Sequence, residues 1–112
     1  MKITSRQNKD FTSVCMEGKL DAANAAEAEK SLSEIYDAGM LNLVVDLSNL
    51  EYVSSAGMRV LLVLAKKVQQ KGGRVSLSNL SAKVREVFDI SGFSTIFKIF
   101  NSAAEAEAYI RG

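Results

Sequence analysis

Two adjacent serines, Ser54 and Ser55, occupy the position of this sequence best suited to chemistry. They precede Ala56, Gly57 and a segment whose apolar residues recur at helical spacing. Both hydroxyls are therefore expected at a helix start, where backbone N–H groups lack intrahelical partners and the helix dipole favours negative charge. A serine there commonly caps the helix, and its hydroxyl is also exposed to modification. The apolar positions are Met58, Leu61, Leu62, Ala65 and Val68.

The segment before these serines is expected to position them. Residues 41–45 form an apolar run typical of a buried strand that ends at Asp46. A short polar turn is expected next, and then the helix, which should continue to about Lys71 because two glycines follow. The predicted order of strand, turn and helix presents Ser54 and Ser55 at one end of a sheet.

This central stretch resembles the signature of the STAS domain, and specifically that of bacterial anti-sigma factor antagonists. The resemblance extends over nearly the whole chain and includes a second stretch, residues 84–93, with a similar helix ending and a glycine-containing turn. It implies a STAS-like fold. The matching pieces of the central stretch are Asp46-Leu47-Ser48, Tyr52, Ser54-Ser55-Ala56-Gly57 and Leu61-Leu62.

The resemblance implies a phosphorylation switch. In the family, a serine at this helix start is phosphorylated by a partner kinase that is also the anti-sigma factor, and a phosphatase resets it. Ser55 is the first choice for the acceptor and Ser54 the second. The chain departs from the family pattern twice, because Ser54 stands where an Asp is usual and Ala56, beside the glycine, cannot be phosphorylated. The implied partner surface comprises Asp21, Ser54, Ser55, Ala56, Gly57, Met58 and Arg59.

Arg59 lies four residues after Ser55, within helical reach of a phosphate there. An exposed, solvated arginine is the alternative interpretation. Met58 has two interpretations as well, an adaptable contact for a partner or a core residue. Asp21 lies in the loop that the family places near the phosphorylation site, and a cap of the following helix is the interpretation preferred for it from the residues alone.

Composition excludes several classes of function. The 112 residues are 47% hydrophobic and 24% charged, with a net charge of +1, which gives no electrostatic basis for binding nucleic acid or an anionic membrane. The chain has no histidine and a single cysteine, Cys15, so the usual zinc sets are missing and no cofactor is expected. The N-terminus lacks a signal-peptide pattern, and no apolar run approaches transmembrane length. We expect a cytoplasmic protein.

The chain in order predicts one α/β domain over residues 1–112. Strands are expected at 1–7, 11–17, 41–45, 74–77 and 96–100, with Gly18 closing the second, and helices at 22–38, 54–71, 82–89 and 103–110. Asp21 or Asn24 is the candidate cap of the first helix. The result is a mixed, mostly parallel sheet of about five strands, covered by about four helices, with the first two strands antiparallel.

Two other classes of function remain as alternatives. A serine–lysine hydrolase would need Lys66 or Lys67, about three helical turns beyond Ser55, so we expect no enzyme. A STAS module that does not switch, serving as a scaffold or interaction module in a larger regulatory or transport assembly, fits the unusual Ser54. The two STAS interpretations differ in whether one serine accepts phosphate.

Overall fold

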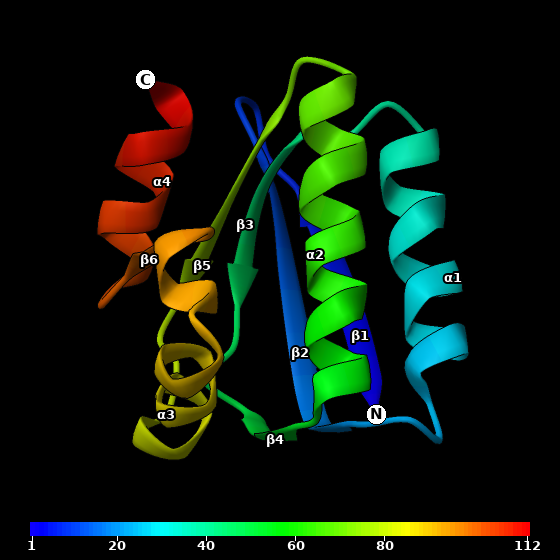
Figure 1. Cartoon of the computed structure of the whole chain (residues 1–112). Coiled ribbons are helices and arrows are strands. Elements are labelled where there is room, and N and C mark those ends of the chain that lie inside the picture. Colours follow the sequence, from blue (N-terminus) through cyan, green and yellow to red (C-terminus); the bar gives the residue numbers. More distant parts are fainter.

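The computed structural model describes residues 1–112 and contains one six-stranded sheet and four α-helices (Figure 1). Five strands follow the order β1-β2-β3-β5-β6, and β4 pairs with β2 beyond the end of β3. The elements in chain order are β1 Lys2–Gln7, β2 Thr12–Leu20, α1 Ala25–Asp37, β3 Asn42–Asp46, β4 Leu50–Val53, α2 Ser55–Gln70, β5 Arg74–Ser78, α3 Ala82–Ser91, the 3-10 turn η1 Phe93–Thr95, β6 Lys98–Phe100 and α4 Ala103–Arg111.

The direction of the strands confirms the predicted fold class. β1 and β2 are antiparallel because only a short turn joins them, and every other pairing is parallel. Each helix that connects two parallel strands carries the chain back to the end of the sheet where the strands begin. The carboxyl ends of β2, β3, β4 and β5 therefore lie at one end of the molecule, at the bottom of Figure 1.

β4 is the strand that the sequence did not predict. Residues 50–53 were expected within a polar turn, yet Leu50 and Val53 are buried and pair with the end of β2. β2 also continues past Gly18, which was expected to close it. Gly18 has φ of +100° at a register shift, a backbone conformation that glycine adopts without strain, so the strand bends there and extends to Leu20.

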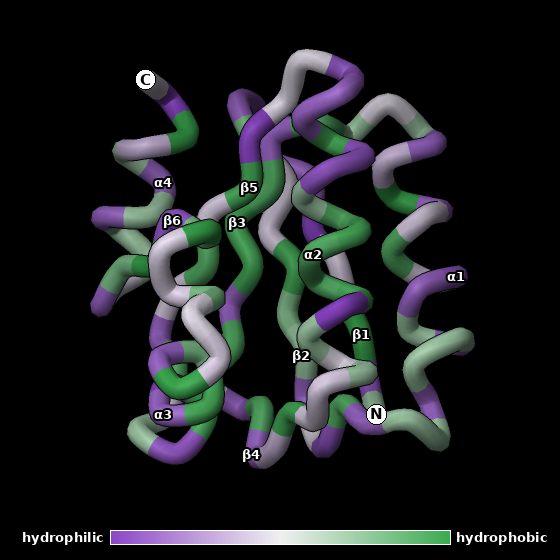
Figure 2. The backbone as a smooth tube through the Cα atoms, in the orientation of Figure 1, coloured by the Kyte–Doolittle hydropathy of each residue, from purple (hydrophilic) through white to green (hydrophobic).

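The two faces of the sheet are covered differently. The main core lies between the sheet and α1, α2 and α3, and α4 packs on the opposite face against β3, β5 and β6. Hydrophobic residues colour the inner strands and the inward side of α2 in Figure 2. Fully buried side chains such as Val14, Leu61 and Phe88 make this core, which fixes the sheet against α2.

Serine caps start three of the four helices. Ser54, Ser81 and Ser102 each accept a hydrogen bond from the backbone N–H three residues later, at 3.2 Å. α1 starts at Ala25, three residues later than predicted. Asn24 is its N-cap residue, but the Asn24 side chain bonds to residues 19 and 21 in place of the helix. The last strand starts at residue 98 and not at 96, because the Ile96 and Phe97 N–H groups still bond to the Phe93 carbonyl of the 3-10 turn.

Candidate functional site

The candidate site is the N-terminal turn of α2 together with the chain that follows β2. Leu20 and Val53 are paired in the sheet, and the Ser54 N–H donates to the Leu20 carbonyl at 2.9 Å. These two contacts bring Asp21 next to Ser54, although 33 positions separate the two residues in the sequence. β4 is therefore the element that joins the two parts of the predicted site.

Gly57 allows this close approach. It is buried in the first turn of α2, and a Cβ atom at this position would lie 2.4 Å from the Leu20 carbonyl oxygen and 2.8 Å from the Leu20 Cγ. Real Cβ atoms do not tolerate such distances, so any side chain would push the helix away from β2. The glycine of the motif is thus a packing requirement that fixes where α2 begins.

The hydroxyls of Ser54 and Ser55 have different environments. Ser54 is half-buried in an extended conformation, and its Oγ accepts the Gly57 N–H at 3.2 Å as the cap of α2. Ser55, the first residue of the helix, is exposed, and its Oγ has no hydrogen-bond partner in the chain. One hydroxyl is committed to holding the helix end, and the other is free on the surface.

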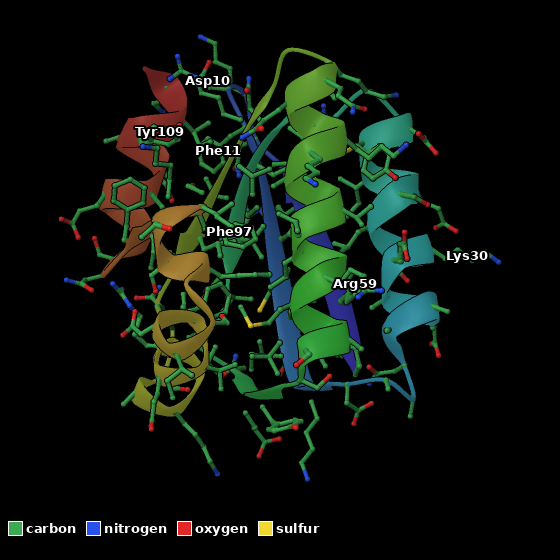
Figure 3. All side chains as sticks on the ribbon, viewed as in Figure 1. Asp10, Phe11, Lys30, Arg59, Phe97 and Tyr109 are labelled. Carbon is green, nitrogen blue, oxygen red and sulfur yellow. The ribbon has the colours of Figure 1, made fainter.

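Met58 and Arg59 also differ in their environments, because one is buried and the other is exposed. Only 2% of Met58 is exposed, and the Ser91 Oγ lies 3.7 Å from its sulfur, so Met58 is a core residue. Neither the Met58 side chain nor the buried Gly57 is exposed on the surface, so their contribution to the partner surface stays a prediction. Arg59 is exposed, forms no ion pair, and extends from α2 toward α1 (Figure 3).

The turn that contains Asp21 is held by three hydrogen bonds. The Asp21 carboxylate accepts the Ala23 N–H, the Asn24 side-chain oxygen accepts the Asp21 N–H, and the Asn24 amide donates to the Lys19 carbonyl. The three distances are 3.0, 3.0 and 2.7 Å. Asp21 therefore shapes this turn and remains half-buried beside the N-terminus of α2, without capping α1.

Two exposed apolar residues at this end of the molecule were not predicted as site residues. Tyr52 on β4 is 43% exposed and Ile90 on α3 is 80% exposed. α3 packs against β4, and Ser91, next to Ile90, contacts Met58 of α2. The sequence did hold a signal for Ile90, because it falls off the inward stripe of Val84 and Phe88.

The helix dipole gives the start of α2 a partial positive charge. The first turn of α2 contains no acidic residue, so the positive end of the helix dipole is unopposed within the helix.

No cluster of three or more His, Cys, Asp or Glu residues is placed to hold a metal ion. None of the helices has the length and apolar character needed to cross a lipid bilayer.

The comparisons with known proteins identify the class of the chain. The family model of the STAS domain matches residues 2–106, and the chain belongs to this family. It is similar to BtrV of Bordetella bronchiseptica, a candidate anti-sigma factor antagonist, with 42% identity over 96% of this chain and 93% of BtrV. The resemblance to anti-sigma factor antagonists that the sequence suggested is confirmed.

Solved structures support the fold. A candidate anti-sigma factor antagonist from Thermotoga maritima superposes with a TM-score of 0.91 at 22% identity, covering 98% of this chain and 95% of that one. The Bacillus cell fate determinant SpoIIAA in its phosphorylated form superposes with a TM-score of 0.71 at 16% identity, over 96% and 99% of the two chains. At these identities the likeness concerns the fold.

Proposed function

We propose that this protein is an anti-sigma factor antagonist that works by partner switching. The unphosphorylated form binds an anti-sigma factor that is also a serine kinase, and this binding releases a sigma factor for transcription. Phosphorylation of Ser55 breaks the complex, and a phosphatase restores the binding form. The similarity to BtrV and the membership of the STAS family support this assignment.

The free hydroxyl of Ser55 is the observation that carries the proposal. A kinase needs an accessible hydroxyl, and Ser55 is exposed without a hydrogen-bond partner. The Ser54 Oγ would have to give up the Gly57 N–H, which removes a cap worth about 1 kcal/mol to the helix. These differences favour Ser55 over Ser54 as the acceptor.

The fold should tolerate phosphate at Ser55. A phosphoserine brings a charge of about −1.5 to −2, and the positive end of α2, whose first turn contains no acidic residue, stabilises it. Arg59, one helical turn further and free of ion pairs, is within reach of the phosphate. The modification therefore changes the charge of the surface without requiring a rearrangement of the core.

Phosphorylation of Ser55 weakens the complex with the partner. A kinase that packs against Ser55, Ala56 and Tyr52 would bury the dianion in the interface, and its desolvation costs several kcal/mol unless new pairs form. That cost is enough to dissociate a complex of ordinary affinity. Asp21, Arg59 and Ile90 complete the proposed surface, with Ile90 as an apolar contact near its margin.

The serine–lysine hydrolase has no geometric support. Lys66 is eleven residues beyond Ser55 on one continuous helix, which corresponds to about 17 Å along the axis at about 1.5 Å per residue. Lys67 is further away, and both side chains are exposed. This separation leaves a serine–lysine pair without support, and we propose a regulatory binding role in the cytoplasm for the chain.

Mapping the phosphorylated residue tests this proposal. The purified chain is incubated with ATP and the kinase fraction of its own organism, and phosphopeptides are identified by mass spectrometry. Phosphate on Ser55 in the wild type, its loss in Ser55→Ala and its persistence in Ser54→Ala are expected. The Ser33→Ala variant is a matched control and should take up phosphate like the wild type. A wild-type chain that takes up no phosphate would instead favour a STAS scaffold that does not switch.

A further inference from the structure

The sheet face on which α4 packs carries a row of polar residues that α4 covers only in part. Strand pairing sets Thr4 opposite Cys15, Cys15 opposite Asp46, and Asp46 opposite Ser78. Residues directly opposite one another in a sheet point to the same side, so these four side chains line one row across four strands. The row runs under the N-terminal part of α4, on the face away from α1 and α2.

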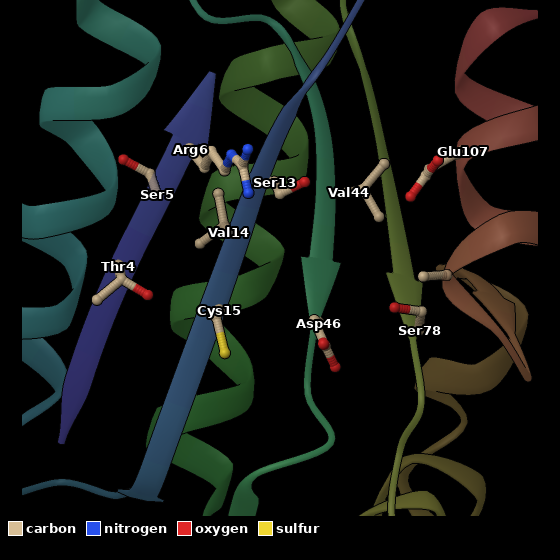
Figure 4. Close-up of a pocket in the computed structure, with 11 residues that line it drawn as sticks. Thr4, Ser5, Arg6, Ser13, Val14, Cys15, Val44, Asp46, Ser78 and Glu107 are labelled. Carbon is tan, nitrogen blue, oxygen red and sulfur yellow. The ribbon is translucent and has the colours of Figure 1, made fainter. Parts of the chain in front are cut away.

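A cavity of about 320 Å³ lies over this row (Figure 4). Its volume is at the lower end of the range of small-molecule sites. Arg6 of β1 bounds one side, and Glu107 of α4 faces it from the other, with Ser13 and Asp46 on the strands between them. The cavity therefore has charged groups of opposite sign at its two sides and hydroxyl groups in between.

Ser78 on the floor of the cavity is the second indication of a ligand. Its side chain is fully buried, and its Oγ has no hydrogen-bond partner. Ser76, on the same strand and the same face, is equally buried, yet its Oγ donates to the Ala106 carbonyl at 3.2 Å. A buried hydroxyl normally has a partner, so the Ser78 hydroxyl is available to a group that enters the cavity.

The charges of the cavity are also available. Arg6 and Asp46 form no ion pair within the chain, and Glu107 has only a long contact of 4.0 Å to Arg111. Asp46 uses one carboxylate oxygen to accept the Ser48 N–H, which leaves the other oxygen free. A ligand complementary to these groups carries an anionic group for Arg6 and a cationic group for the two carboxylates.

We propose that this cavity binds a small zwitterion of the α-amino acid class. The carboxylate of the ligand pairs with the Arg6 guanidinium, the ammonium group lies between Asp46 and Glu107, and the Ser78 hydroxyl, directly opposite Asp46, accepts a hydrogen bond from that ammonium group. The site is separate from Ser55 and does not depend on the phosphorylation switch. Cys15 borders the ligand as a neutral thiol, since burial together with the charges of Asp46 and Glu17 raises its pKa.

A nuclear magnetic resonance titration tests the site with the whole, unphosphorylated chain. Each of the proteinogenic L-amino acids is added to the ¹⁵N-labelled protein up to millimolar concentration. We expect saturable shifts of the Cys15, Asp46 and Ser78 amides with at least one of them. The matching deaminated acid and decarboxylated amine should each bind at least about tenfold more weakly, because each lacks one of the two charges. No saturable shift with any amino acid, or equal binding of either analogue, would overturn the proposal.

Variants separate a ligand site from a general effect on the fold. Arg6→Gln and Asp46→Asn should each weaken binding by about tenfold or more, whereas Lys30→Gln on exposed α1 should leave it unchanged. Ser78→Ala should weaken binding without lowering the melting temperature, because the hydroxyl it removes has no partner in the chain. Binding that is unaffected by both charge variants would show that the shifts arise elsewhere. Because no kinase is present, failure here leaves the proposed switch untouched.

Discussion

At the scale of single residues, two neighbouring hydroxyls have acquired different roles through one hydrogen bond. Ser54 gives its oxygen to the Gly57 N–H, and Ser55, one position later, is left exposed. Local geometry of the helix end is enough to produce this difference. The same geometry places the free hydroxyl at the positive end of α2, where an added phosphate is stabilised.

The Cys15 thiol should ionise above its ordinary range. Burial raises its pKa most, and the negative charges of Asp46 and Glu17 raise it further. We expect the rate of alkylation by iodoacetamide, followed against pH, to have a midpoint above that of a free cysteine, which is about 8.5. Asp46→Asn should lower the midpoint, and the remote Glu34→Gln should not. A wild-type midpoint at or below the free value would contradict this assignment.

At the scale of elements, the junction between β2, β4 and α2 depends on one missing side chain. Gly57→Ala places a methyl group against the Leu20 carbonyl, so we expect a loss of about 1 to 3 kcal/mol in the free energy of unfolding. This loss of stability would be opposite in sign to the gain that usually follows when alanine replaces glycine in a helix. Chemical denaturation measures it, and a stabilised variant would show that α2 is free to shift.

Gly73→Ala provides a matched control for that variant. A Cβ at this position would lie 2.0 Å from the Leu41 carbonyl oxygen, so a comparable loss of stability is expected at the opposite end of α2. Partner binding should fall with Gly57→Ala but not with Gly73→Ala when both are measured well below their melting temperatures. Equal loss of binding would mean that stability alone, and not the position of α2, controls the interaction.

The contribution of the C-terminal end of α3 to the stability of the fold should depend on pH. The Ser94 hydroxyl donates to Asp89, and this bond, with help from Arg85, lowers the pKa of the Asp89 carboxyl. Because the folded pKa is below the unfolded value of about 3.9, this contribution is present above that value and is lost as the pH falls through the folded pKa. Ser94→Ala should therefore flatten the loss of stability between about pH 5 and pH 3. An unchanged pH profile would contradict it.

At the scale of the whole molecule, one continuous core joins the sheet to three helices. The main cluster contains 22 buried residues drawn from strands and helices along nearly the entire chain, and α4 seals the opposite face. We propose that residues 1–112 unfold as a single domain. Circular dichroism and tyrosine fluorescence should then report one coincident transition, and two separated transitions would refute this.

The sequence predicted the fold class and most elements because their hydrophobic patterns are long and regular, as in α2. It missed β4 because only Leu50 and Val53 of its four residues are buried, and its pairing with β2 is a tertiary contact. The same contact brings Asp21 to Ser54. Met58 was ambiguous for a related reason, since a helix pattern does not show which neighbouring element covers a residue near its end.

The affinity of two variants for the kinase partner tests the central claim most directly. Ser55→Ala and Ser55→Asp are used as baits in the lysate of the organism that encodes the chain, and the retained serine kinase is then titrated against each. The proposed switch predicts that the Ala variant binds the kinase and that the Asp variant binds it at least about tenfold more weakly. Equal affinity of the two variants, or capture of no kinase by either, would contradict it.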